Sequence, residues 1–179
     1  MNTGMRIVLV VMIGFALTVG IGCAPTLVSV SNPEIQTAGN PYYDARLEPL
    51  SRGRNFFVVF RLTVTNRTDK NLEIDWNKTR YVYNGSSRGV FVFKGIKPED
   101  IKNLTIPPDI IPARGTFSKE ISPYRLIARA PIREGSSERG IYSGLLPKGE
   151  NGIRLLVRQN GKEIVEQITV NIVDKEFGK

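Results

Sequence analysis

The chain has 179 residues, a formal net charge of +8, no histidine and one cysteine. Without histidine, neither a Ser-His-Asp nor a Cys-His catalytic arrangement can form, and the usual zinc sites are excluded as well. A positive charge of this size favours anionic partners through long-range attraction. We therefore expect a protein that is not an enzyme, needs no cofactor or metal, and is attracted to acidic material.

The first 22 residues have the composition of a secretory signal. Arg6 is followed by an uncharged, largely apolar run over 7–22, and small residues directly precede Cys23. A short basic start, an apolar stretch and a small-residue cleavage site define such signals. With the cysteine at the cleavage site, the segment resembles a bacterial lipoprotein signal, which implies removal of residues 1–22 and lipidation of Cys23. Two alternatives remain open: an uncleaved membrane anchor, and ordinary cleavage that leaves the cysteine as a free thiol.

The lipoprotein resemblance also implies a location. A lipidated chain is anchored to a membrane of the bacterial cell envelope, with its domain outside the cytoplasm. In enteric bacteria, an aspartate directly after the lipidated cysteine resembles an inner-membrane retention signal. This chain has Ala24 at that position instead, so we expect the outer membrane, facing the periplasm, if two membranes are present. The anionic partners in that compartment are lipid headgroups and acidic glycans, and we expect no nucleic acid among them.

Composition divides the rest of the chain into two parts. The stretch 23–54 is rich in proline, asparagine and glycine, which indicates a lipid-anchored tether, with a candidate edge strand at 26–30. From 55 to 179, short apolar runs alternate with turn-forming residues, and this part is predicted to be one folded domain of ordinary size.

Apolar residues at every second position predict half-buried strands at 56–64 and 72–76. A hairpin is predicted between 79–83 and 89–93, with 84–88 as its loop. The pair Asn160–Gly161 predicts a second hairpin, because this dipeptide is the strongest short-range hairpin signal. The remaining predicted elements are a helical turn at 96–102, an extended stretch at 105–112, a strand at 116–121, a candidate strand at 125–129 and a long strand at 163–173.

These elements amount to about seven or eight short strands and no long helix. Sheets with one apolar face must pack face to face or close on themselves, so we predict an all-β fold, an immunoglobulin-like antiparallel β-sandwich with Trp76 in its core. An apolar strand that runs into Asn66-Arg-Thr-Asp69 and then into an isoleucine-containing strand resembles small immunoglobulin-like bacterial lipoproteins. That resemblance implies the fold and no functional residue.

The candidate binding residues lie on the predicted hairpin at 79–93: Tyr81, Tyr83, Arg80 and Arg88. Tyrosine and arginine are enriched where proteins bind their partners, and alternate tyrosines on an exposed sheet face suit sugar rings or a protein surface. In the competing interpretation, both tyrosines point inward and pack in the core of the sandwich.

Two acidic patterns are weaker candidates. Asp69, Asn71, Glu73 and Asp75 recur at every second position, with Leu72, Ile74 and Trp76 alternating with the acids. The polar outer face of a strand explains this spacing better than a calcium loop does. Glu134 and Glu138 lie in a glycine- and serine-rich loop, which offers no shaped cleft for an acid/base pair. We therefore predict neither a metal site nor catalytic residues.

Together these features predict a membrane-anchored envelope lipoprotein whose non-catalytic β-sandwich binds or scaffolds another envelope component. The alternative is a binding protein for acidic glycans or lipids, which the positive charge and the tyrosine/arginine hairpin favour.

Overall fold

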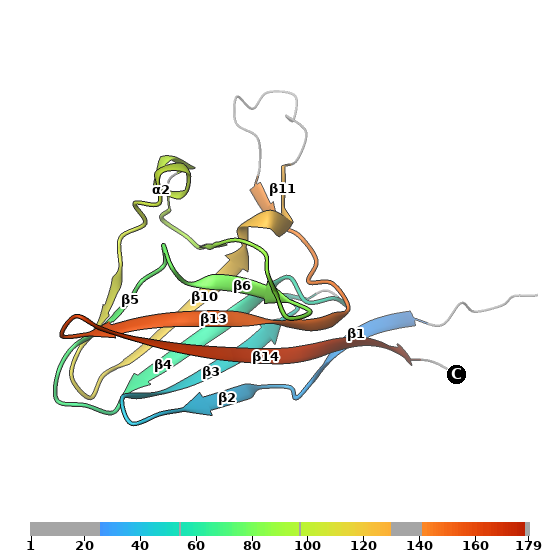
Figure 1. Ribbon diagram of the computed structural model, residues 1–179. Helices are drawn as coiled ribbons and strands as arrows, with labels where there is room; N and C mark the ends of the chain where they lie inside the picture. Colours follow the sequence, from blue (N-terminus) through green and yellow to red (C-terminus); the bar gives the residue numbers. More distant parts are fainter. Residues whose placement is uncertain (1–25, 54, 97, 130–140, 178–179) are drawn as a thin grey trace, which may run out of the picture. The chain divides into compact units, whose positions relative to one another are not determined.

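A computed structural model describes residues 26–53, 55–96, 98–129 and 141–177. Two antiparallel β-sheets pack face to face within the unit Leu27–Lys175, and this arrangement confirms the predicted all-β sandwich. Figure 1 shows β13 and β14 in front of β3, β4 and β10. No helix among the described residues is long and apolar enough to cross a membrane. The predicted signal segment and Cys23 lie outside the described residues.

The first sheet has seven strands, in the order β1-β14-β13-β5-β9, with β6 paired to β13 and β7 paired to β6. β13 and β14 form the long hairpin predicted at Asn160–Gly161, and both turn residues have positive φ, 50° and 78°. The strand bounds are β1 Thr26–Asn32, β5 Leu72–Ile74, β6 Arg80–Tyr83, β7 Ser86–Ser87, β9 Asp109–Ile111, β13 Gly149–Gln159 and β14 Lys162–Phe177.

The second sheet has five strands in the order β2-β3-β4-β10-β8, and a separate two-stranded sheet pairs β11 with β12. The predicted strand at 116–121 and the predicted helical turn at 96–102 are confirmed by β10 and by the helix α2. The bounds are β2 Gln36–Gly39, β3 Tyr43–Leu50, β4 Val59–Asn66, β8 Phe91–Val92, α2 Pro98–Asn103, β10 Thr116–Pro123, the 3-10 helix η1 Tyr124–Leu126, β11 Ile127–Arg129 and β12 Ile141–Ser143.

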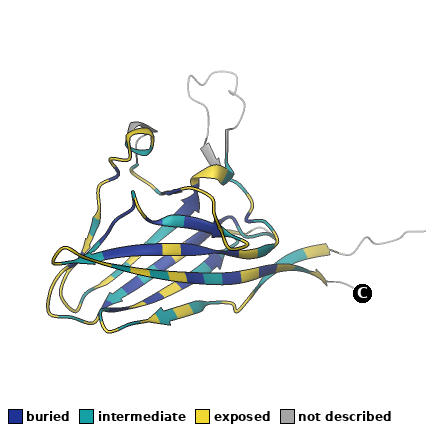
Figure 2. Ribbon diagram, in the orientation of Figure 1, coloured by how far each residue is buried: buried dark blue, intermediate teal, exposed yellow. Residues whose placement is uncertain are grey.

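The core lies between the two sheets, where alternate residues of each strand point inward. Figure 2 shows buried and exposed residues alternating along β13 and β14. On β4 the inward side chains are Phe60, Leu62 and Val64, all fully buried, and Arg61 is exposed between them. Trp76 is also fully buried, as predicted. Burial of these apolar faces is the main favourable term in folding.

A mixed polar and aromatic cluster joins the sheets beside Trp76. Its indole nitrogen donates to the Asp109 carboxylate on β9, at 2.7 Å, and the Lys119 ammonium on β10 pairs with the same carboxylate. The ammonium also lies 4.0 Å from the centre of the Phe93 ring. Because hydrogen bonds to charged groups are stronger than neutral ones, this cluster fixes the spacing of β9 and β10.

The prediction of a tether over 23–54 is wrong for most of that stretch. Its second half forms β2 and β3, which belong to the second sheet, and Tyr43, Ala45 and Leu47 are fully buried. The alternation from Tyr43 to Leu50 is a period-two pattern that turn-forming neighbours obscured. Pro49 lies past Leu47, the last residue of β3 that pairs with β2, so this end of β3 is an open edge, where proline is tolerated. The candidate edge strand is confirmed as β1, at the edge of the first sheet.

The predicted hairpin between 79–83 and 89–93 also needs correction. β6 instead pairs with β7 across the two-residue turn Asn84–Gly85, and both turn residues have positive φ, as such tight turns require. The chain then leaves this hairpin, and β8 pairs with β10 in the other sheet. The two halves of the predicted hairpin therefore lie in different sheets.

We expect Leu47→Ala to lower the free energy of unfolding by about 2–5 kcal/mol, because it removes a fully buried side chain from the core. Arg46→Ala, at the next position on the exposed face of β3, serves as the control and should change it by less than about 0.5 kcal/mol. Urea unfolding measures both values. Equal, small effects would mean that 43–50 is a tether after all.

Candidate functional site

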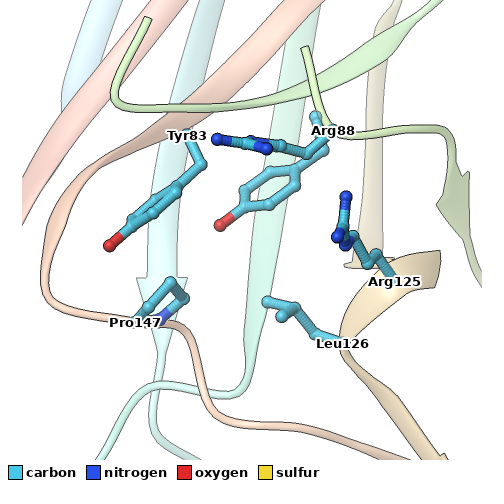
Figure 3. A pocket seen from close by; sticks show the side chains of 6 residues that line it. Tyr83, Arg88, Arg125, Leu126 and Pro147 are labelled. Carbon is cyan, nitrogen blue, oxygen red and sulfur yellow. The ribbon is translucent and has the colours of Figure 1, made fainter. Parts of the chain in front are cut away.

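An open pocket of about 250 Å³ lies between the β6–β7 hairpin and η1. Figure 3 shows its side chains converging from separate segments, with Arg88 and Arg125 on the side away from Pro147. The residues that line it are Tyr81, Tyr83, Arg88, Arg125, Leu126 and Pro147. The pocket therefore combines aromatic and aliphatic walls with two guanidinium groups.

The tight turn at Asn84–Gly85 places Arg88 beside the tyrosines. The backbone N–H of Arg88 donates to the Tyr81 carbonyl at 2.8 Å, and the N–H of Tyr81 donates to the Gly89 carbonyl. Arg88 thus lies directly across from Tyr81, and cross-strand neighbours point to the same face of a sheet. The other cation, Arg125, comes from η1, which directly follows β10 of the second sheet.

Tyr81 forms the inner wall of the pocket and is 2% exposed. Its hydroxyl donates to Oδ1 of Asn151 at 2.6 Å, and its ring meets Phe91 edge-on with centroids 6.0 Å apart. Burial raises the pKa of the Tyr81 phenol, because low polarity disfavours the phenolate. The hydroxyl therefore stays protonated and acts as a fixed donor within the protein.

The fully buried Asn151 ties this tyrosine to the opposite wall. Its amide nitrogen donates to the carbonyls of Pro147 and Gly149, at 2.7 and 2.9 Å. Tyr83 makes a similar link nearby, since its hydroxyl donates to the Lys148 carbonyl at 2.8 Å. Both phenols are thus engaged with the chain that leads into β13, so among the described lining residues the side-chain donors not engaged in this way are the guanidinium groups of Arg88 and Arg125.

Arg88 and Arg125 are both exposed. Neither forms an ion pair with a carboxylate of the described residues, whereas Arg61 pairs with Glu48 at 3.2 Å and Arg158 pairs with Asp75 at 2.5 Å. A guanidinium group presents a planar fork of donors that matches carboxylate and phosphate oxygens. Two such groups at one pocket favour an anionic ligand.

The structure brings three of the four predicted binding residues to this pocket: Tyr81, Tyr83 and Arg88. Arg80 is not among the lining residues, and its guanidinium donates to the carbonyls of Asn77 and Thr79, at 2.6 and 3.1 Å. Sequence reasoning missed Arg125, because the stretch around it shows no clear periodicity and nothing in the sequence links it to the hairpin.

The acidic residues considered as ligands or catalysts lie elsewhere. Asp69 pairs with Arg114 at 2.8 Å, and Glu73 and Asp75 both pair with Arg158. In the part of the chain that the structure describes, no three acidic, histidine or cysteine residues are grouped so that they could hold a metal ion. Glu134 and Glu138 lie outside the described residues.

Comparison with known proteins adds no assignment: no family model, no curated protein and no solved structure matches this chain.

Removing one hydroxyl from each tyrosine tests the role of Asn151. We expect Tyr81→Phe to lower the free energy of unfolding by about 1–3 kcal/mol, because the buried Asn151 oxygen loses its donor. Tyr83→Phe is the matched control, since the Lys148 carbonyl lies where water can replace the lost bond, and its cost should stay below about 1 kcal/mol. Urea unfolding of both variants gives the comparison, and equal costs would contradict the assignment.

Proposed function

We propose that this protein is a lipid-anchored component of the bacterial cell envelope whose non-catalytic β-sandwich binds an acidic glycan or lipid. The observation that carries the proposal is the pocket in which Arg88 and Arg125, neither paired with a carboxylate of the described residues, accompany the tyrosine rings. The lipoprotein-type signal ending at Cys23 supports the location, and the positive charge of the chain supports an acidic partner.

The dimensions of the site favour a small acidic group over a protein partner. Ligand pockets usually enclose about 300–1,000 Å³, and this one, at about 250 Å³, is near the lower limit. A stable protein interface needs about 800 Å² from each partner, far more than these six side chains offer. Ring faces and aliphatic carbons suit the apolar side of a sugar or a glycerol group, while the guanidinium groups suit a carboxylate or a phosphate.

The chemistry of the lining residues supports binding without catalysis. Arginine remains protonated at every physiological pH, so Arg88 and Arg125 provide fixed positive charge. Both phenols donate to acceptors of the protein itself, and no carboxylate is found among the described lining residues. Such a site provides neither a general base nor an activated nucleophile.

The lipid anchor is tested with Cys23→Ser. We expect the mature native chain to begin at Cys23, to carry added acyl mass and to fractionate with membranes, because the thiol is the acylation point that the signal implies. The serine variant should lack the added mass and be lost from the membrane fraction or mislocalised. Intact mass spectrometry and membrane fractionation make the measurement. A native chain without acyl mass that fractionates like the variant would remove the anchor from the proposal.

The acidic ligand is tested with the double variant Arg88→Gln/Arg125→Gln. Retention on cell-wall and lipid preparations from the native membrane should fall by about tenfold or more, because charge-assisted hydrogen bonds are lost. It should also fall with added salt in the unaltered protein. The double control Arg46→Gln/Arg154→Gln removes the same two charges from exposed positions on β3 and β13 and should leave retention unchanged. Equal losses in both variants would mean that net charge, rather than the pocket, governs retention.

A further inference from the structure

The pocket is linked by a short series of contacts to the strand that follows the anchor. Ser29 on β1 donates to the Asp174 carboxylate at 2.9 Å, and the other oxygen of that carboxylate lies 2.6 Å from the Lys148 ammonium. The Lys148 carbonyl in turn accepts the hydroxyl of Tyr83 from the pocket wall. Three contacts thus connect β1 with the ligand site.

The covalent chain between the proposed anchor and this strand is short. Ser29 is six residues after Cys23, and six residues span at most about 20 Å even when fully extended. β1 already begins at Thr26, so no long tether separates the lipid from the domain. A lipid on Cys23 would hold Ser29, and the pocket linked to it, near the headgroups of the membrane.

Exposed apolar side chains lie beside the two arginines in the sequence and the fold. Tyr124 directly precedes Arg125 and is 49% exposed, and Leu145, two residues before Pro147, is equally exposed. The two segments are adjacent, because a Cβ atom at Gly144 would lie only 2.0 Å from the Leu126 carbonyl oxygen. Exposed aromatic and aliphatic groups beside basic ones are typical of surfaces that lie in the headgroup region of a membrane.

We propose that the pocket binds the phosphate of an anionic lipid headgroup in the membrane that holds the anchor, so that the domain lies against that membrane. This inference rests on the proposed function, and it selects the lipid among the acidic ligands. Arg88 and Arg125 provide the charge complementary to the phosphate, and Tyr124 and Leu145 provide the apolar contact. Tethering raises the local concentration of the headgroup to the millimolar range, so even a weak pocket would be occupied.

Chemical modification of arginine tests this inference on the native lipidated protein. The protein is reconstituted in vesicles of phosphatidylcholine alone, whose phosphate is neutralised by its own choline cation, or of phosphatidylcholine mixed with the anionic phosphatidylglycerol. Both samples are treated with phenylglyoxal. Peptide mass spectrometry then gives the modification rate of each arginine. We expect Arg88 and Arg125 to react at least about fivefold more slowly in the anionic vesicles than in phosphatidylcholine alone, because tethering keeps the pocket occupied. The exposed Arg46 and Arg154 are internal controls and should react equally in both.

Two soluble competitors separate the sources of an acidic group. Glycerol 3-phosphate and polygalacturonate are each added to the phosphatidylcholine vesicles. Protection by glycerol 3-phosphate equal to that by phosphatidylglycerol would identify a free phosphate ester as the ligand and overturn the membrane source. Protection by polygalacturonate alone would overturn the lipid and leave the proposed function standing. No protection in any vesicle or competitor sample would overturn both.

A variant pair tests whether the two arginines act on one ligand. With Arg125→Gln, the protection of Arg88 by anionic vesicles should disappear, because a phosphate shared between two guanidinium groups loses half of its contacts. Arg154→Gln removes the same charge from the outer face of β13 and should leave the protection intact. Both positions are exposed, so neither change affects the core. Protection of Arg88 that survives Arg125→Gln would mean that no shared site exists.

Discussion

The buried amide of Asn151 is the constraint on which the pocket depends. A polar group without exposure to water destabilises the fold unless each of its hydrogen bonds is made. Here the oxygen accepts from Tyr81 and the nitrogen donates to the carbonyls of Pro147 and Gly149. These bonds fix β6 against the start of β13. Tyr81 and Pro147 consequently hold their positions as pocket walls before any ligand arrives, and a preformed site avoids the cost of ordering its walls on binding.

The net charge predicts an acidic partner but does not show where that partner binds, because many arginines of a basic protein form ion pairs within the fold. Arg61, for example, bridges β4 to β3 through Glu48, and Arg158 bridges β13 to β5 through Glu73. Such exposed pairs contribute little to stability, yet they occupy the guanidinium groups. The informative arginines are those, such as Arg88 and Arg125, that lie at a concave site without such a partner among the described residues. Only the folded chain distinguishes the two kinds.

The sequence was sufficient where one local pattern determines the structure. Alternation predicted β4, and Asn160–Gly161 predicted the β13–β14 hairpin, because both depend on neighbouring residues alone. The errors arose where local signals compete or are absent. Asn84–Gly85 is an equally strong turn signal, but the apolar runs on either side of 84–88 favour a longer loop. The pairing of Phe91–Val92 with β10 depends on a distant strand. Arg125 reaches the pocket only through tertiary structure, so no spacing in the sequence could have revealed it.

The corrected position of the first strands also changes how an anchored domain would work. A long tether would let the domain sample the space away from the membrane, at an effective concentration that falls with tether length. With β1 beginning at Thr26 and β2 and β3 built into the sandwich, a lipid on Cys23 would instead restrict the domain to the membrane surface. A pocket of modest affinity is then sufficient, because the anchor keeps the lipid headgroups at a high local concentration. Two guanidinium groups and a few exposed apolar side chains match that requirement better than a deep, high-affinity cavity would.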